Sequence, residues 1–169
     1  MEYLWAPWRM EYILGKKKRG CFLCQKLREK KDKKHFILYR GQHVFVTMNK
    51  FPYTSGHLMV VPKRHCVHLE QLKSDESKEL FDLLKTSVRA LKASFRPHGF
   101  NIGMNIGKMG GAGEDHLHLH IVPRWAGDTN FMPVLGKTKV ISEYLEETYE
   151  KLHSAFANLL RKKEVQKGG

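Results

Sequence analysis

The sequence predicts an α+β fold, in which an antiparallel β-sheet carries one inserted helix and one C-terminal helix. Short apolar or alternating runs, which are typical of strands, lie on both sides of one long amphipathic stretch. A second amphipathic stretch closes the chain, and several of the joining loops are short, as antiparallel neighbours allow. The 169 residues are enough for a proper apolar core, so we expect a single domain over residues 1–169.

The predicted strands are short runs separated by turn-forming residues. They are residues 35–39, 43–48, 56–62, 100–106 and 116–122. The third, Gly56 to Pro62, is an almost continuous apolar run bounded by glycine and proline, which is typical of a central strand. Pro123 is expected to close the last strand. The polar segment Gln25 to Glu29 is expected to be helical and to precede the sheet.

The inserted helix is predicted over Ser74 to Phe95, because apolar residues recur there at three- and four-residue steps. Those residues are Leu80, Leu84, Val88, Leu91 and Phe95. Ser74 is the expected N-cap, without a glutamate at the capping-box position, and Pro97 and Gly99 end the helix. The C-terminal helix is predicted over residues 142–161. Its apolar stripe is expected to consist of Ile141, Tyr144, Leu145, Leu152, Phe156 and Leu160.

The formal net charge of +13 favours anionic partners. A phosphate-rich small molecule, a nucleic acid and an acidic protein are all compatible with it. The basic runs at residues 16–19, 30–34 and 161–163 lack interleaved aromatic residues. We therefore interpret them as solvated loop or helix-end clusters.

Residues 1–19 form an aromatic and basic N-terminal arm that includes Trp5, Trp8 and Tyr12. Because exposed aromatic patches are unfavourable, we expect the arm to pack on the body or on a second subunit. No apolar run is long enough to span a bilayer, and the start lacks the features of a secretory signal. The three cysteines, an odd number, argue against a disulfide framework. We expect a cytoplasmic protein with no membrane partner.

The most informative feature is a row of alternating histidines, His116, His118 and His120. Strand side chains alternate between faces, so the three imidazoles are expected on one face, about 7 Å apart. The row has two functional interpretations. Either the histidines bind a metal ion, for which imidazole is the commonest ligand, or one of them is a nucleophile that its neighbours position.

A glycine-rich loop before the row favours the nucleophile. Its glycines are Gly107, Gly110, Gly111 and Gly113. The backbone N–H groups of such a loop can bind phosphate. Neutral imidazole can attack phosphorus and form a labile P–N bond, which splits one difficult displacement into two easier ones. The central histidine, His118, is the expected nucleophile because both neighbours flank it.

These residues resemble the histidine-triad (HIT) superfamily of nucleotide hydrolases and transferases. Residues 116–122 match the family signature of three alternating histidines and two apolar residues. Asn49 and residues 56–65 match a second sequence block of the family. The resemblance covers about residues 20–125 as the core, leaving residues 126–169 as a loop and the C-terminal helix. It implies a homodimer, with a curved antiparallel sheet in each half.

The resemblance also implies roles for individual residues. His118 occupies the nucleophile position, and His120 and His57 occupy the positions of the histidines that orient it. Asn49 corresponds to a residue that contacts ribose hydroxyls, and Asn105 to an amide that contacts phosphate.

One departure separates this chain from many members of the superfamily. Ala112 and Gly113 replace a glutamine and a serine or threonine whose side chains touch the phosphate or the leaving group. Only backbone donors remain here, at Gly111, Ala112 and Gly113. In other stretches the chain is similar to a narrower group, the bacterial diadenosine tetraphosphate phosphorylases. In that group Trp125 is expected near the bound nucleotide.

A structural zinc ion is the only cofactor that the resemblance implies. Zinc-bearing members use a pair of cysteines, the histidine that ends the second block and the first histidine of the triad. All four ligands are present, as Cys21, Cys24, His65 and His116. Two cysteines and two histidines close a tetrahedral site, so the zinc would be structural. No organic cofactor is expected.

The leading functional hypothesis is cleavage of a dinucleoside polyphosphate through a nucleotidyl-histidine, by phosphorolysis or by hydrolysis. A second uses the same intermediate on nucleoside phosphoramidates or adenylate conjugates. A third is a nucleotide- or nucleic-acid-binding protein without turnover, which the charge favours and the intact triad disfavours. A fourth is a metalloenzyme that binds a catalytic metal through all three triad histidines.

Overall fold

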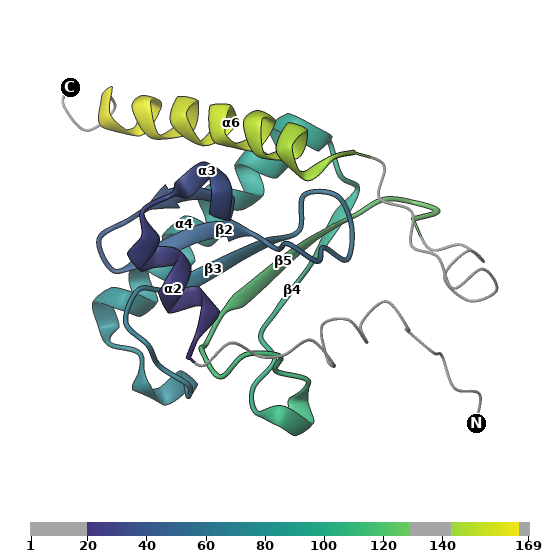
Figure 1. Cartoon of the computed structure of the whole chain (residues 1–169). Coiled ribbons are helices and arrows are strands. Elements are labelled where there is room, and N and C mark those ends of the chain that lie inside the picture. Colours follow the sequence, from purple (N-terminus) through teal and green to yellow (C-terminus); the bar gives the residue numbers. More distant parts are fainter. Residues whose placement is uncertain (1–19, 129–142, 166–169) are drawn as a thin grey trace, which may run out of the picture.

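A five-stranded antiparallel sheet with helices on both faces forms the body of this computed structural model, which describes residues 20–128 and 143–165 (Figure 1). The strands are β1 (Ile37–Arg40), β2 (Val44–Met48), β3 (Leu58–Pro62), β4 (Gly99–Gly103) and β5 (Leu119–Arg124). They lie in the order β1-β2-β3-β5-β4. The predicted α+β class and the antiparallel sheet are confirmed. The aromatic arm, residues 1–19, lies outside the described residues.

The helices are α2 (Phe22–Glu29), α3 (Asp32–His35), α4 (Ser74–Phe95) and α6 (Leu145–Val165). Two single 3-10 turns, η2 (Leu69–Gln71) and η3 (Lys108–Gly110), lie in loops. The bounds of α4 agree with the prediction, but the prediction of its N-cap is wrong. Lys73 occupies that position, and the carboxylate of Glu76 accepts its backbone N–H at 3.0 Å. The glutamate of the capping box is therefore present, counted from Lys73.

Several strand boundaries differ from the prediction. β1 begins at Ile37 instead of residue 35, because His35 ends the short helix α3. That helix overlaps the basic run at residues 30–34, which had been interpreted as a loop or helix-end cluster. β4 ends at Gly103 instead of residue 106. β5 begins at Leu119 and continues through Pro123, which pairs with Phe100 of β4. Its pairing with β3 ends at Ile121, so a proline beyond that point interrupts no ladder between β3 and β5.

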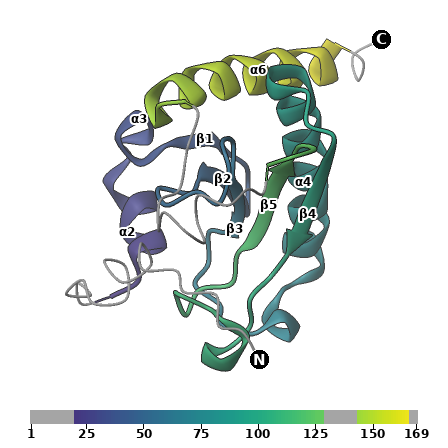
Figure 2. The ribbon, with the colours of Figure 1, turned by 90° about the vertical axis from the view of Figure 1, so that its right-hand side faces the viewer.

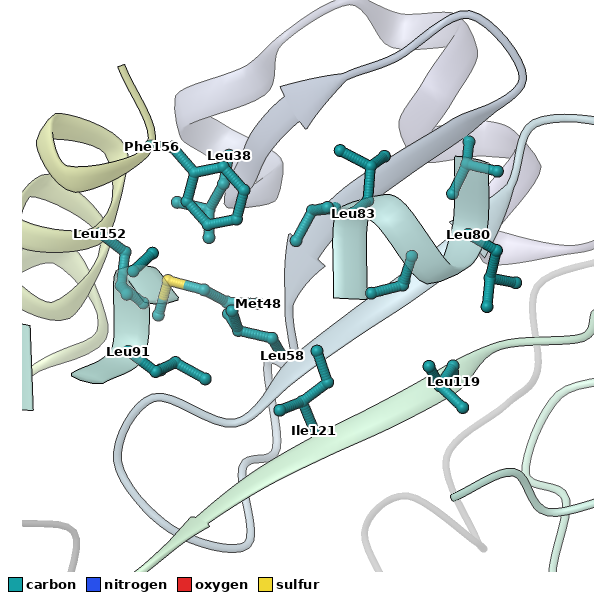
Figure 3. Packing of buried hydrophobic residues seen from close by; sticks show 14 of the residues in the cluster. Leu38, Met48, Leu58, Leu80, Leu83, Leu91, Leu119, Ile121, Leu152 and Phe156 are labelled. Atoms are coloured by element: carbon teal, nitrogen blue, oxygen red, sulfur yellow. The ribbon is translucent and has the colours of Figure 1, made fainter. Parts of the chain in front are cut away.

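Helices α4 and α6 cover one face of the sheet, and α2 covers part of the other (Figure 2). Leu152 and Phe156 of α6 pack with Met48 and Leu38 in the main core (Figure 3). This confirms their place in the predicted apolar stripe. Tyr144 was wrongly assigned to that stripe, because it is 77% exposed just before the helix begins.

Tyr149 instead fills the inner face of α6, where its hydroxyl donates to the backbone carbonyl of Ile37. Ile141, the first residue of the predicted stripe, lies outside the described residues. None of the helices in the described ranges is both long and apolar enough to cross a membrane.

Candidate functional site

The face of the sheet opposite α4 carries the histidines of the candidate site. His57 comes directly before β3, and His120 lies near the start of β5, where it pairs with Gly103 of β4. His118 lies one residue before β5. The rings of His118 and His120 are 4.6 Å apart, and those of His57 and His120 are 5.1 Å apart. The structure thus brings together the three residues predicted to be catalytic.

The row of histidines is not one continuous strand, as had been predicted. The backbone N–H of Leu117 donates to the carbonyl of Cys66, in the loop after β3, at 2.7 Å. This bond holds the segment of His116 against that loop before β5 begins. His116 therefore faces a different set of neighbours from His118 and His120.

A backbone carbonyl fixes the orientation of His118. Its Nδ1 donates to the carbonyl of His116 at 2.7 Å. In a neutral imidazole one nitrogen carries the proton and the other a lone pair, so Nε2 of His118 has the free lone pair. His118 is 8% exposed, which restricts the ring to this position. The arrangement gives His118 one defined nitrogen lone pair, which a nucleophilic histidine requires.

His57 and His120 are joined by a hydrogen bond between His57 Nε2 and His120 Nδ1, 3.0 Å long. The backbone N–H of Tyr53 donates to His57 Nδ1 at 3.1 Å. Tyr53 was not among the residues predicted for the site. No sequence signal marks it, since every residue except proline carries a backbone N–H.

Burial, and then the nearby His118, lowers the pKa of His120 from 6.5 to about 4. Its ring is therefore neutral near physiological pH. The folded protein gives up this proton more readily than the unfolded chain does. The contribution of the neutral His120 ring to the free energy of unfolding is fully present above about pH 6.5 and is lost as the pH falls towards 4.

We expect the free energy of unfolding to fall between pH 6.5 and pH 4, and to fall less in a His120→Asn variant. The titration of one group changes the free energy of unfolding by at most about 1.4 kcal/mol per pH unit. Urea unfolding of both proteins at pH 7.0, 5.5 and 4.5 checks this. Parallel pH dependences of the two proteins would contradict it.

The glycine-rich loop folds on itself through η3. The N–H of Gly111 donates to the carbonyl of Lys108 at 3.0 Å, and that of Ala112 to the carbonyl of Gly107 at 3.1 Å. Among the described residues, the N–H of Gly113 meets no acceptor. Of the three backbone donors predicted to bind phosphate, the structure thus leaves one unused by the loop. Gly111 has a φ of +83°, which favours glycine there.

Asn105 and Asn49 lie at two different edges of the site. The Nδ2 of Asn105 is 3.5 Å from the carbonyl oxygen of Gly111, which places it against the glycine loop. The Oδ1 of Asn49 accepts the N–H of Phe51 at 2.9 Å, and its own N–H donates to the carbonyl of His57 at 2.9 Å. Asn49 is thus joined directly to a site histidine.

Trp125 lies at the opposite end of β5 from His118. The six residues of β5 lie between them, so the two are about 20 Å apart along the strand. The indole N–H of Trp125 donates to the carbonyl of Phe95, at the end of α4. Within one chain, the structure does not bring Trp125 to the histidines.

The structure also brings together the four predicted metal ligands, Cys21, Cys24, His65 and His116. Their ligand atoms all lie within 4.8 Å of one another. Nδ1 of His116 is 3.2 Å from Cys21 Sγ and 3.5 Å from Cys24 Sγ, and Cys24 Sγ is 3.6 Å from Nδ1 of His65. Ligand atoms around a tetrahedral zinc ion are about 3.3–3.8 Å apart. The set can hold a metal ion.

The neighbours of these ligands also fit a metal. Nε2 of His116 donates to the carbonyl of Pro62 at 2.9 Å, so Nδ1 carries the lone pair that faces the cysteines. Burial lowers the pKa of His116 to about 4, which keeps the ring neutral, as a ligand must be. Burial also raises the pKa of Cys21 to about 12. A bound cation would deprotonate this thiol.

A family model described as "HIT domain" matches residues 30–127 of the chain. The AP-4-A phosphorylase of Mycobacterium tuberculosis is 37% identical over 166 residues, covering 93% of this chain and 85% of the relative. The Zn-bound histidine triad family protein of Mycobacterium smegmatis is 26% identical, with a TM-score of 0.69 over 85% of this chain and 97% of that one.

A hypothetical histidine triad nucleotide-binding protein of Sulfolobus tokodaii gives a TM-score of 0.70 at 26% identity. The match covers 84% of this chain and 95% of that one. The family model spans more than half of the chain, and its residues include His57, His118 and His120. The chain therefore belongs to the histidine-triad (HIT) family.

Proposed function

We propose that this protein cleaves dinucleoside polyphosphates, with diadenosine tetraphosphate as the model substrate, through a nucleotidyl intermediate on His118. The observation that carries the proposal is the hydrogen bond from His118 Nδ1 to the carbonyl of His116, which leaves Nε2 as the attacking atom. The 37% identical relative named AP-4-A phosphorylase supports this substrate class.

In the proposed first step, the lone pair on His118 Nε2 attacks the α-phosphorus of the substrate. A P–N bond forms, and the bond from that phosphorus to the bridging oxygen breaks. With diadenosine tetraphosphate the leaving group is ATP, and an adenylyl group remains on His118. The carbonyl of His116, which accepts the Nδ1 proton, stabilises the positive charge that develops on the ring.

In the second step an oxygen nucleophile attacks the same phosphorus and breaks the P–N bond. Inorganic phosphate would release ADP, and water would release AMP. His118 returns to its neutral form in both cases. Backbone donors of the glycine loop, among them the N–H of Gly113, are proposed to hold the nonbridging oxygens. In this proposal Asn49 contacts the ribose and Asn105 the phosphate.

Incubation of the purified protein with diadenosine tetraphosphate, with and without inorganic phosphate, tests the proposal. We expect ATP and ADP in the presence of phosphate, because the closely related chain is named a phosphorylase. Chromatographic separation of the products gives the result directly. ATP and AMP at equal rates under both conditions would make the protein a hydrolase. Absence of turnover in both would contradict the substrate class and favour phosphoramidates or adenylate conjugates.

We also propose zinc as the metal of the Cys21, Cys24, His65 and His116 set. Two thiolates and two imidazoles in tetrahedral spacing suit zinc, and they leave no position for a catalytic water. When bound, the zinc would stabilise the fold and not the reaction. The Zn-bound relative of M. smegmatis supports this choice.

A homodimer is proposed from the exposed edge of the sheet. β4 ends the order of strands, and Ile102, on that edge strand, is 46% exposed. An edge strand with exposed apolar residues is a surface for pairing with another chain. Because Trp125 lies far from His118 in its own chain, its proposed nucleotide contact requires a second subunit or the distal end of the substrate.

A further inference from the structure

Tyr53, in the loop between β2 and β3, contacts both supporting histidines of the site. Its ring stacks on the ring of His57, with centroids 4.9 Å apart and an interplanar angle of 22°. The same ring lies 6.3 Å from that of His120. Its backbone N–H donates to His57 Nδ1 at 3.1 Å. One residue thus reaches the pair both through its ring and through its main chain.

The hydrogen bond from Tyr53 sets the direction of the bonds that follow it. A backbone N–H can only donate, so Nδ1 of His57 must carry a lone pair and Nε2 the proton. The proton on His57 Nε2 then donates to Nδ1 of His120 across 3.0 Å. His120 must therefore hold its own proton on Nε2. The tautomer of His120 follows from a backbone amide two hydrogen bonds away.

The loop holds this amide in place by several bonds of its own. The carbonyl of His57 accepts the N–H of Asn49 at 2.9 Å, and the N–H of His57 donates to the carbonyl of Thr54 at 3.2 Å. The hydroxyl of Thr54 donates to the carbonyl of Pro123 on β5 at 2.8 Å. The loop is thus closed on itself and attached to the strand that carries His120.

A fixed tautomer matters here because side-chain donors are few. Ala112 and Gly113 carry no hydrogen-bonding side chain, and they stand in the loop that leads to the nucleophile. The ring of His120 lies 4.6 Å from that of His118. A proton on His120 Nε2 gives the site a neutral donor next to the attacking nitrogen. The other tautomer would present a lone pair, which repels phosphate oxygens.

We propose that Tyr53 is a positioning residue, which holds His57 and His120 with their protons on Nε2 so that His120 donates a hydrogen bond to the leaving phosphate. The identity of the leaving group rests on the proposed function. The tautomers themselves do not, because they are a property of the ligand-free protein. The two statements can therefore fail separately.

Imidazole nitrogen chemical shifts, measured by NMR on the ligand-free protein, test the tautomers. In the wild type we expect His57 and His120 protonated on Nε2 and His118 on Nδ1. Tyr53→Ala keeps the backbone N–H but removes the stacked ring that holds His57 Nδ1 against it. The His57 ring can then turn away from this N–H, and we expect mixed tautomers at His57 and His120 with His118 unchanged. Tyr53→Phe keeps the stacked ring and should restore the wild-type shifts. Tyr53 is 42% exposed, so the fold should tolerate both changes.

Steady-state kinetics with diadenosine tetraphosphate provide the second readout. We expect Tyr53→Ala to lower kcat about 10-fold or more, with KM changed less than about 3-fold, because a misdirected donor affects the transition state more than binding. Tyr144→Ala is the matched control, since Tyr144 is a 77% exposed tyrosine outside the site. Wild-type His57 protonated on Nδ1, or a Tyr53→Ala variant with unchanged tautomers, would overturn the proposal.

Discussion

Replacing His118 with alanine is expected to abolish turnover of diadenosine tetraphosphate while nucleotide binding persists. The variant removes the only atom proposed to form a bond with phosphorus, so the covalent route has no substitute. Loss of a nucleophile typically lowers kcat by about 10⁴-fold or more. Product release measured by chromatography, together with AMP binding measured by calorimetry, checks both parts of the prediction.

Two controls make the His118 result specific. His68→Ala removes an exposed histidine outside the site and should leave kcat unchanged. Rapid acid-free quenching of the wild type should trap an adenylyl group on His118, detected by mass spectrometry of the peptide. A His118→Ala protein that retains a tenth or more of the wild-type kcat would rule out the mechanism. A dead variant that also fails to bind AMP would indicate a disturbed site.

Apolar periodicity was enough to predict the long helix. The bounds predicted for α4, Ser74 to Phe95, agree with the structure because its buried face repeats over six turns and is ended by Pro97. The start of β5 could not be predicted in the same way. Residues 116–118 had been predicted as the start of this strand because they alternate as strand residues do. The hydrogen bond from the N–H of Leu117 to the carbonyl of Cys66 holds them in the loop instead. Such a long-range bond leaves no trace in local alternation.

In the candidate site, the functional side chains could be predicted from the sequence, but the main-chain groups that orient them could not. The choice of His118 and the four candidate metal ligands could be made from side chains, because their types and spacing carry chemistry. The groups that orient them are the carbonyls of His116 and Pro62 and the N–H of Tyr53. Every residue has a carbonyl, so only the folded chain reveals which one reaches a histidine.

The four candidate metal ligands come from three separate parts of the chain, and one of them contacts the proposed nucleophile. Cys21 precedes α2 and Cys24 lies in its first turn, His65 follows β3, and His116 is linked to His118 through its carbonyl. α2 contributes one fully buried side chain, Leu23, to the smaller core cluster. Without a metal, few other contacts would hold the start of α2 against the segment before β5. The site should therefore contribute strongly to stability.

Substituting Cys24 with serine is expected to remove the zinc and lower the melting temperature by about 10 °C or more. Structural zinc contributes directly to folding free energy, and a loss of about 3 kcal/mol shifts the melting temperature of a chain this size by about 6–12 °C. Elemental analysis should give one zinc per chain in the wild type and none in the variant. Calorimetry with and without a chelator measures the shift.

Cys66→Ala is the matched control, because Cys66 is a buried cysteine that is not part of the metal set. It should keep its zinc and lose only the packing of one thiol. A structural site further predicts that a chelator inactivates the wild type slowly, in step with the loss of fold measured by circular dichroism. Instant inactivation with the fold intact would instead mean that the metal takes part in the reaction. A wild-type protein purified without metal, and as stable as Cys24→Ser, would show that these four residues bind none.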